Sequence, residues 1–273
     1  MLRPLTALVI LLIAALPAAA APPGLDRLVT QLRLPDVIEI MASEGEAHGA
    51  DIEAEMFPGQ GGARWPAVVA AIYDPTRGTR IMTDQLRESL DEGQIDALIE
   101  FFGSPLGERI ITLEIDARRA IADEAVEQAA YDQLHEMQQD EAPRLDLITA
   151  LIEANDLVDL NVAGGLNANL AFYTGLADGG AFGADLPQQD MLRDIWSQEP
   201  DLRADTEEWL YAYMLMAYEP LSDNDLRAYI DLAETPEGRA LNHALFAGFD
   251  VLYRQVSHEL GLASARMMAT QDL

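Results

Sequence analysis

The chain has 273 residues, of which 49% are hydrophobic, and its 47 acidic and 17 basic residues give a net charge of −30 at pH 7. A surface of this charge repels nucleic acid and anionic membranes, so neither is an expected partner. The chain contains no cysteine, which excludes disulfides, a lipoprotein anchor and thiolate metal sites.

Residues 1–20 have the pattern of a Sec-type signal peptide. Arg3 supplies the positive start, residues 5–16 the apolar segment, and Ala18, Ala19 and Ala20 the small-residue cleavage site. We therefore expect cleavage after Ala20 and a periplasmic location for the mature protein. The apolar run is too short for a stable membrane span, and no second such run follows it.

Apolar residues in the rest of the chain recur three and four positions apart, which predicts an all-α protein. The pattern predicts helices over residues 36–57, 65–73, 79–90 and 91–102, the first of them interrupted by Gly45 and Gly49. After Pro105 it predicts one long helix that ends at Pro143. No segment has the alternating pattern of a strand.

Residues 90–109 contain a helix–turn–helix motif that returns at residues 221–239. Asp91 and Ser222 are the expected N-caps of the first helix in each copy, and Gly103 is expected to end that helix in the left-handed conformation. In each copy a hydroxyl residue then caps the second helix, proline occupies its first position, and glycine follows two residues later. These motif residues are Ser104, Pro105, Gly107, Thr235, Pro236 and Gly238.

Gly107 and Gly238 stand inside their helices, where glycine costs about 1 kcal/mol relative to alanine. Their recurrence at the same offset predicts a close contact between each helix and the one before it. The alternative is a glycine that is merely tolerated in a frayed first turn.

The two motif copies predict a protein of two related helical halves, residues 21–143 and 144–273. The helix that begins near Leu145 is expected to continue to Tyr173. Residues 161–186 form a Gly/Asn-rich insertion in the second half. A period of this length indicates a domain duplication rather than a solenoid repeat.

Residues 101–109, Phe-Phe-Gly-Ser-Pro-Leu-Gly-Glu-Arg, resemble the aromatic-x-Ser-Pro-x-Gly-x-basic signature of a periplasmic helical family known as domain of unknown function 2059. The second copy, at residues 235–239, is similar but has Leu232 and Ala233 in place of the paired aromatic residues. The resemblance implies an exported, all-helical protein. It carries over no catalytic residue, because none is established for the family.

No stretch has a recognised catalytic or cofactor-binding pattern. His135 and His258 are each followed by Glu, as in a zinc-protease helix, but Gln139 and Leu262 occupy the position of the required second His. A weak divalent-cation site is one interpretation of the densest carboxylate–imidazole group, and a solvated helix face is the simpler one. We therefore predict no catalytic residue, no metal site and no cofactor. The group consists of Glu44, Glu46, His48, Asp51 and Glu53.

Residues 161–176 carry no charge, although the chain is otherwise rich in acidic residues. Asparagine is unfavourable inside helices but forms hydrogen bonds between buried surfaces. One interpretation is a groove that binds a ligand or partner, and the other is a central helix buried between the two halves. The residues predicted to bind are Asn161, Asn167, Asn169, Phe172 and Tyr173.

These features predict an exported periplasmic protein that binds a partner in the cell envelope and does not catalyse a reaction. Two alternatives are an enzyme with an unrecognised carboxylate-based site and a carrier of a small apolar ligand. A pocket with strongly perturbed carboxylates would favour the enzyme, and an apolar cavity would favour the carrier. A broad uncharged patch would favour the interaction protein.

Overall fold

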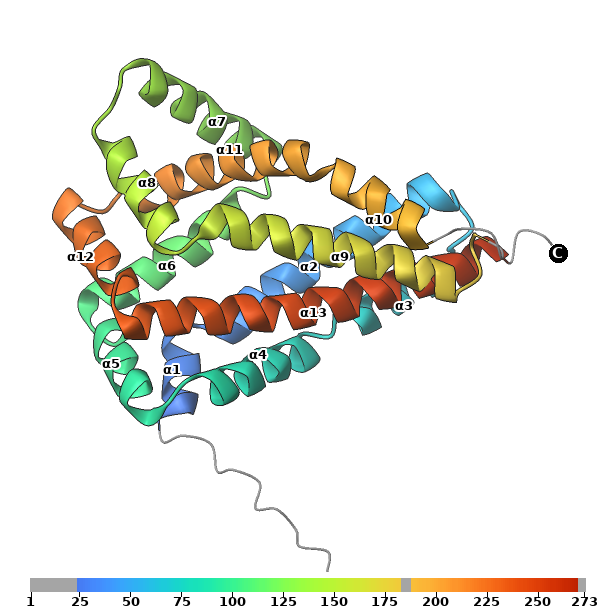
Figure 1. Cartoon of the computed structure of the whole chain (residues 1–273), viewed down its shortest axis with the longest axis horizontal. Helices are drawn as coiled ribbons and strands as arrows, with labels where there is room; N and C mark the ends of the chain where they lie inside the picture. Colours follow the sequence, from blue (N-terminus) through green and yellow to red (C-terminus); the bar gives the residue numbers. More distant parts are fainter. Residues whose placement is uncertain (1–23, 183–187, 270–273) are drawn as a thin grey trace, which may run out of the picture.

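The computed structural model describes residues 24–182 and 188–269, and within these ranges the chain consists of α-helices and connecting turns (Figure 1). The all-α prediction is confirmed for this part of the chain. The predicted signal peptide, its cleavage site at Ala20 and part of the Gly/Asn-rich insertion lie outside the described residues. The helices are α1 (Leu25–Gln31), α2 (Leu34–Met56), α3 (Arg64–Ile72), α4 (Pro75–Ser89), α5 (Glu92–Phe102), α6 (Pro105–Ala120), α7 (Glu124–Gln139), α8 (Arg144–Ala154), α9 (Leu157–Asp178), α10 (Gln188–Ser197), α11 (Glu199–Tyr218), α12 (Asp223–Ala233) and α13 (Pro236–Ala269).

The 34-residue helix α13 extends along the length of the molecule, and α9 runs beside it (Figure 1). Glycines permit this close approach. A Cβ at Gly175 would lie 2.1 Å from the carbonyl oxygen of His258, and a Cβ at Gly261 would lie 2.1 Å from that of Phe172. A larger residue at either position would push the two helices apart.

The first helices of the two motif copies, α5 and α12, both begin with a capping box. Asp91 Oδ1 accepts a hydrogen bond from the Gln94 amide at 2.9 Å, and Gln94 Oε1 accepts one from the Asp91 amide at 2.9 Å. Ser222 and Asp225 make the same reciprocal pair at the start of α12. Each box satisfies two amides that have no partner within the helix, so both helices begin where their local sequence places them.

The second helices of the two copies, α6 and α13, also begin alike. The amide of Gly107 donates to Ser104 Oγ at 3.1 Å, and that of Gly238 donates to Thr235 Oγ1 at 3.0 Å. Proline occupies the first position of each helix. It has no amide hydrogen to leave unsatisfied there.

Both motif glycines face the end of the preceding helix. A Cβ at Gly107 would lie 2.3 Å from the carbonyl oxygen of Phe101, and a Cβ at Gly238 would lie 2.1 Å from that of Leu232. The neighbouring atoms belong to the backbone and cannot rotate away. Glycine at these positions therefore permits the sharp turn between the helices.

Gly103 does not adopt the left-handed conformation predicted for it. Its φ is −87°, in the right-handed helical region, and Glu234 at the equivalent position of the second copy has a φ of −79°. A side chain is compatible with this backbone, which explains how glutamate can stand where the first copy has glycine.

Two predicted long helices are each broken into two. The helix expected over 105–143 ends at Ala120, and a new one begins behind Asp123, whose carboxylate accepts from the amides of Ala125 and Val126. The helix expected to continue to Tyr173 ends at Ala154, and Asp156 at the junction has a positive φ of 49°. Aspartate is more favourable at helix caps and in turns than in helix interiors. Asp123 therefore starts a new helix, although the apolar pattern continues past the end of α6.

Helix α2 is continuous, contrary to the predicted interruption at Gly45 and Gly49. Both glycines are buried on the face that meets α3. A Cβ at Gly45 would lie 2.2 Å from a ring carbon of Tyr73, and one at Gly49 would lie 2.7 Å from a methyl group of Val69. These glycines admit a neighbouring side chain and do not end the helix.

Two hydrophobic clusters fill most of the interior. The first combines α1 to α5 and one face of α6 with α13, and the second combines the other face of α6 and helices α7 and α8 with α11 and α12. Each cluster therefore contains residues from both sides of position 143. The side chains between the two clusters leave a large cavity.

Candidate functional site

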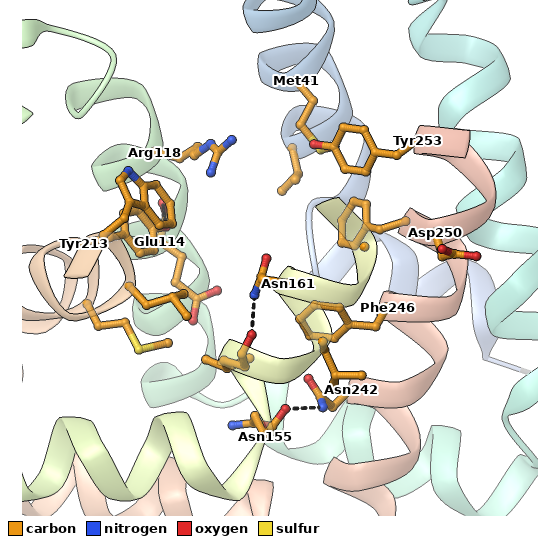
Figure 2. Close-up of a pocket in the computed structure, with 18 of the residues that line it drawn as sticks. Met41, Glu114, Arg118, Asn155, Asn161, Tyr213, Asn242, Phe246, Asp250 and Tyr253 are labelled. Carbon is orange, nitrogen blue, oxygen red and sulfur yellow. Dashed lines mark hydrogen bonds between the residues drawn. The ribbon is translucent and has the colours of Figure 1, made fainter. Parts of the chain in front are cut away.

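A cavity of about 940 Å³, partly open to solvent, lies between the two hydrophobic clusters and is bordered by α2, α6, α9, α11 and α13 (Figure 2). Small-molecule sites occupy roughly 300–1,000 Å³, so this one is large enough for a drug-sized ligand. Most lining side chains are apolar. The apolar lining includes Leu32, Val37, Ile40, Met41, Ile111, Ile115, Leu160, Met214, Phe246 and Phe249.

Glu114 brings a carboxyl group into this apolar space. It stands on α6 among Ile110, Ile111 and Ile115, so it shares the inward face of that helix. The side chain lies deep in the protein but is only half-buried, because part of its surface faces the cavity that it lines. In Figure 2 it points from one wall toward the open space.

Three tyrosines hold Glu114 in place. Oε1 accepts a hydrogen bond from the Tyr218 hydroxyl at 2.6 Å and another from the Tyr229 hydroxyl at 3.1 Å. The Tyr213 hydroxyl donates to the backbone carbonyl oxygen of Glu114 at 2.8 Å. Among the described residues, no donor makes a hydrogen bond to Oε2. One carboxylate oxygen is therefore satisfied by protein, and the other is free for a ligand.

Burial raises the pKa of the Glu114 carboxyl above its ordinary value of 4.5, although the hydrogen bonds from Tyr218 and Tyr229 act in the opposite direction. Desolvation penalises the charged form of a carboxyl group, and here it outweighs the two donors. The same burial, together with the charge of Glu114, raises the pKa of both tyrosines well above 10. They therefore remain protonated donors at neutral pH.

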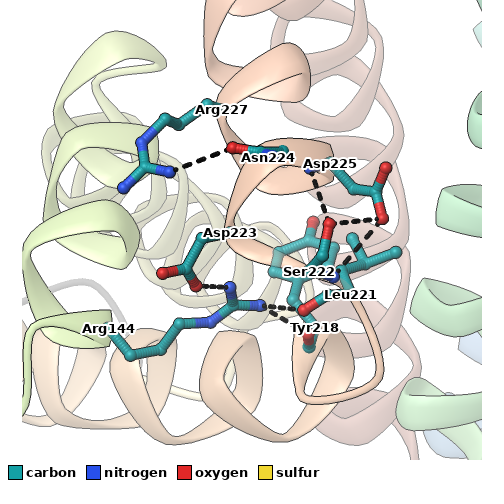
Figure 3. A network of polar contacts seen from close by, with 8 residues as sticks. All are labelled: Arg144, Tyr218, Leu221, Ser222, Asp223, Asn224, Asp225 and Arg227. Atoms are coloured by element: carbon teal, nitrogen blue, oxygen red, sulfur yellow. Dashed lines mark hydrogen bonds and ion pairs between the residues drawn. The ribbon is translucent and has the colours of Figure 1, made fainter.

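Tyr218 is positioned by the network at the end of α11 (Figure 3). Arg144 of α8 donates to the carbonyl oxygens of Tyr218 at 2.7 Å and of Leu221 at 3.0 Å, and to Asp223 Oδ1 at 2.6 Å. These carbonyl groups lie where a helix end leaves acceptors without partners. One guanidinium group therefore joins α8, α11 and α12 beside the ring that contacts Glu114.

Arg118, one turn after Glu114 on α6, also lines the cavity. Its Nε and Nη2 donate to the two carboxylate oxygens of Glu44 at 2.8 and 2.7 Å. The guanidinium carbon lies 5.4 Å from the centre of the Trp209 ring, which stacks on Tyr213 at 4.9 Å. The charge of Arg118 is thus already balanced by a bidentate partner on α2.

The opposite wall belongs to α13, from which Phe246 and Tyr253 point toward the open space, whereas the Asp250 carboxylate turns away from it (Figure 2). Asn242 donates to the carbonyl oxygen of Asn155 at 2.8 Å and so ties α13 to the end of α8.

The structure brings two of the five predicted binding residues to the cavity. Asn161 lines it and donates to the Leu157 carbonyl oxygen of its own helix at 2.7 Å. Asn167 lines it and donates to Asp250 Oδ1 at 2.8 Å. Asn169, Phe172 and Tyr173 do not line the cavity. Phe172 packs against the first hydrophobic cluster, and Tyr173 packs against a smaller cluster beside α10.

The acidic group around His48 does not converge. Glu44 pairs with Arg118, and Glu53 Oε1 accepts from the Gly61 amide at 3.0 Å. In residues 24–182 and 188–269, no group of three or more His, Asp or Glu side chains is arranged to hold a metal ion.

Sequence reasoning missed Glu114 and its tyrosines. The available signal was a single acidic residue on the apolar face of α6, between Ile111 and Ile115. With 47 acidic residues in the chain, this pattern alone does not distinguish Glu114 from the others.

The fold and the site define a class: within the described residues, an all-helical protein with a partly open, mainly apolar cavity whose wall carries a carboxyl group, that of Glu114. Residues 79–133 match the family described as "Uncharacterized protein conserved in bacteria (DUF2059)". This segment is about a fifth of the chain and includes the first motif copy, Glu114 and Arg118; the second copy lies outside it. No curated protein and no solved structure matches the chain. Within the described residues, every helix is too short or too polar to cross a membrane.

Proposed function

We propose that the protein is an exported, periplasmic binding protein that holds a small, mainly apolar ligand in the cavity between α2, α6, α9, α11 and α13. The observation that carries this proposal is the cavity itself, about 940 Å³ with mainly apolar walls and a few polar groups that point inward. Ligand sites typically combine these two features.

The molecular surface favours a ligand carrier over a protein that binds a partner through an apolar patch. Among the described residues, the exposed large hydrophobic side chains are Trp196, Val251 and Tyr253. They lie on two different helices, and Tyr253 also lines the cavity. Two of the asparagines that suggested a partner-binding face, Asn161 and Asn167, belong to the cavity wall. We therefore place the partner-binding hypothesis second to ligand binding.

An enzyme with a carboxylate-based site is a further candidate function. The observation that favours it is the raised pKa of Glu114, since a carboxyl group that stays protonated closer to neutral pH can act as a general acid. Binding is preferred because His243, the imidazole on this lining, is exposed at the surface and makes no hydrogen bond to Glu114. A general acid without a second positioned group supports little chemistry.

Binding is tested with the neutral fluorescent dye Nile red. Gly164 lines the cavity, and a Cβ built there meets no atom within 4 Å, so Gly164→Phe places a ring in the open space. We expect saturable, one-to-one binding to the wild type and at least tenfold weaker binding to this variant. Ala177→Phe, at an exposed position of the same helix, is the matched control. The proposal fails if the dye does not saturate or if both variants bind it equally.

The export part of the proposal has its own test. The charged start, apolar segment and small-residue site of residues 1–20 support it. Expression in a Gram-negative host, followed by osmotic release and N-terminal sequencing, should place the protein in the periplasm with Ala21 as its first residue. A full-length cytoplasmic protein would contradict the proposal.

We also infer that the two motif copies arose by duplication of a helical unit, giving the halves 21–143 and 144–273. The similar capping and glycine contacts of the two copies support this inference. The similarity between the copies does not extend to the residues before the motif. Trp65 and Trp196 stand at the same distance before their motif copies, but Trp65 is 1% exposed and Trp196 is 63% exposed. Duplication predicts that Gly107→Ala and Gly238→Ala destabilise the protein to similar extents.

A further inference from the structure

The cavity contains an acceptor that the protein leaves without a donor. Both tyrosine hydroxyl groups that reach Glu114 bind Oε1, and no described residue makes a hydrogen bond to Oε2. A carboxylate removed from water is unfavourable unless it is paired and its oxygen atoms accept hydrogen bonds. A ligand that donates to Oε2 would supply the missing partner.

The fixed charges on the cavity lining leave a negative balance. The lining has two carboxylates, Glu114 and Asp250, and one guanidinium group, that of Arg118. Arg118 is occupied by the bidentate pair with Glu44. Asp250 accepts from Asn167 at 2.8 Å and from Arg254 at 3.5 Å, so it too has protein partners. Glu114 is the charged group on this lining without an oppositely charged protein partner.

Aromatic side chains lie next to Glu114. Tyr213, Tyr218 and Tyr229 contact Glu114, and Tyr229 is fixed by stacking on Phe101 at a centroid distance of 6.1 Å. The faces of such rings attract cations, and the attraction grows where water is excluded. The ring faces do not attract an anion, and the hydroxyl groups of Tyr218 and Tyr229 already donate to Glu114.

We propose that the ligand is an apolar amine, with its ammonium group against Glu114 Oε2 and its apolar body along Phe246 and Phe249. This inference rests on the proposed binding function and specifies the ligand class. The net charge of −30 acts in the same direction, because it raises the local concentration of cations and repels anions.

The test compares three probes that share a ten-carbon chain: decylamine, decanol and decanoate. Each is titrated below its aggregation limit against the full mature protein preloaded with Nile red, at pH 7 and low salt. We expect decylamine to displace the dye with at least tenfold higher affinity than decanol, and decanoate to be the weakest. Equal affinities, or decanoate as the tightest probe, would overturn the amine assignment and leave the cavity as a general apolar site.

Variants locate the effect. Glu114→Gln should reduce the amine-to-alcohol affinity ratio toward one. Glu114→Asp keeps the negative charge but places it closer to the backbone, so it should give an intermediate ratio. Glu108→Gln removes an exposed carboxylate from the same helix and should leave the ratio unchanged. If Glu114→Gln keeps the ratio, Glu114 is not the receptor for the amine. If the wild type binds neither Nile red nor any probe, the proposed function itself is wrong.

Discussion

The Tyr218 hydroxyl donates a 2.6 Å hydrogen bond to Oε1 of Glu114 and thereby joins α11 to α6 across 104 positions of the sequence. Tyr229 of α12 donates to the same oxygen. This pair of donors holds the carboxyl group at the cavity wall and leaves its second oxygen without a hydrogen bond from the described residues. The site therefore depends on three helices meeting at one side chain.

The first prediction concerns the pH dependence of stability. The pKa of Glu114 is higher in the folded protein than the ordinary value of 4.5, so the folded state binds the proton more tightly. The stability that the protonated group contributes is fully present below about pH 4.5 and is lost as pH rises through the raised pKa. The free energy of unfolding of the wild type relative to Glu114→Gln should therefore fall with increasing pH.

Urea unfolding of both proteins between pH 4 and pH 8 measures this difference. The side chains in contact with Glu114 are those of Tyr213, Tyr218 and Tyr229, and the Arg118–Glu44 ion pair lies one turn further along α6. The three tyrosines have pKa values raised above 10 and do not titrate in this range. Glu108→Gln controls for the loss of one negative charge. A difference that stays constant with pH would contradict the raised pKa of Glu114.

Removing one donor to Glu114 should also destabilise the protein. Tyr218→Phe deletes the hydroxyl group and leaves Oε1 with Tyr229 alone. The expected loss is about 1 kcal/mol of unfolding free energy, the typical net contribution of one hydrogen bond, because Tyr229 still donates to Oε1. Tyr173→Phe is the control, because its hydroxyl makes no hydrogen bond with the described residues, and it should change stability by no more than about 0.5 kcal/mol. Equal effects of the two substitutions would mean that the Tyr218–Glu114 bond contributes nothing.

Replacing a motif glycine by alanine should destabilise the protein, although helix propensity alone favours alanine. Gly107→Ala would gain about 1 kcal/mol from propensity, but its Cβ would stand 2.3 Å from the Phe101 carbonyl oxygen. Separating the two helices should cost more than this gain, with a net destabilisation of about 1–3 kcal/mol. Gly93→Ala is the matched control, because the nearest atom to its Cβ is Asp91 Oδ1 at 3.5 Å, an ordinary contact. A thermal melt in which Gly107→Ala is more stable than the wild type would show the contact to be harmless.

The large negative charge predicts a salt effect on stability. Self-repulsion among unbalanced carboxylates weakens the compact state, and salt screens it over a Debye length of about 10 Å at 0.1 M. The melting temperature should therefore rise with NaCl from low ionic strength. Differential scanning calorimetry measures this rise, with CaCl2 at micromolar concentration as the comparison. A rise with calcium alone would point to a cation site near His48, and a flat NaCl response would mean that the charges are spread too widely to matter.

The sequence alone predicted the helical class and the starts of the motif helices. Asp91, Ser104, Ser222 and Thr235 accept from amides only three positions away, so their effect is contained in the local sequence. Local sequence was a poorer guide to where long helices break. The apolar period continues through Ile121, and the helix ends there because Asp123 caps a new one.

Only the tertiary structure decided the site. Asn161 and Asn167 reach the cavity while Asn169, Phe172 and Tyr173 do not, because one helix can present only one face to a given space. Glu114 is one acidic residue among many in the sequence. Its burial, its raised pKa and its free oxygen arise when Tyr218 and Tyr229, 104 and 115 positions away, close around it. Desolvation depends on what surrounds a group in space, and the chain order near Glu114 does not contain that information.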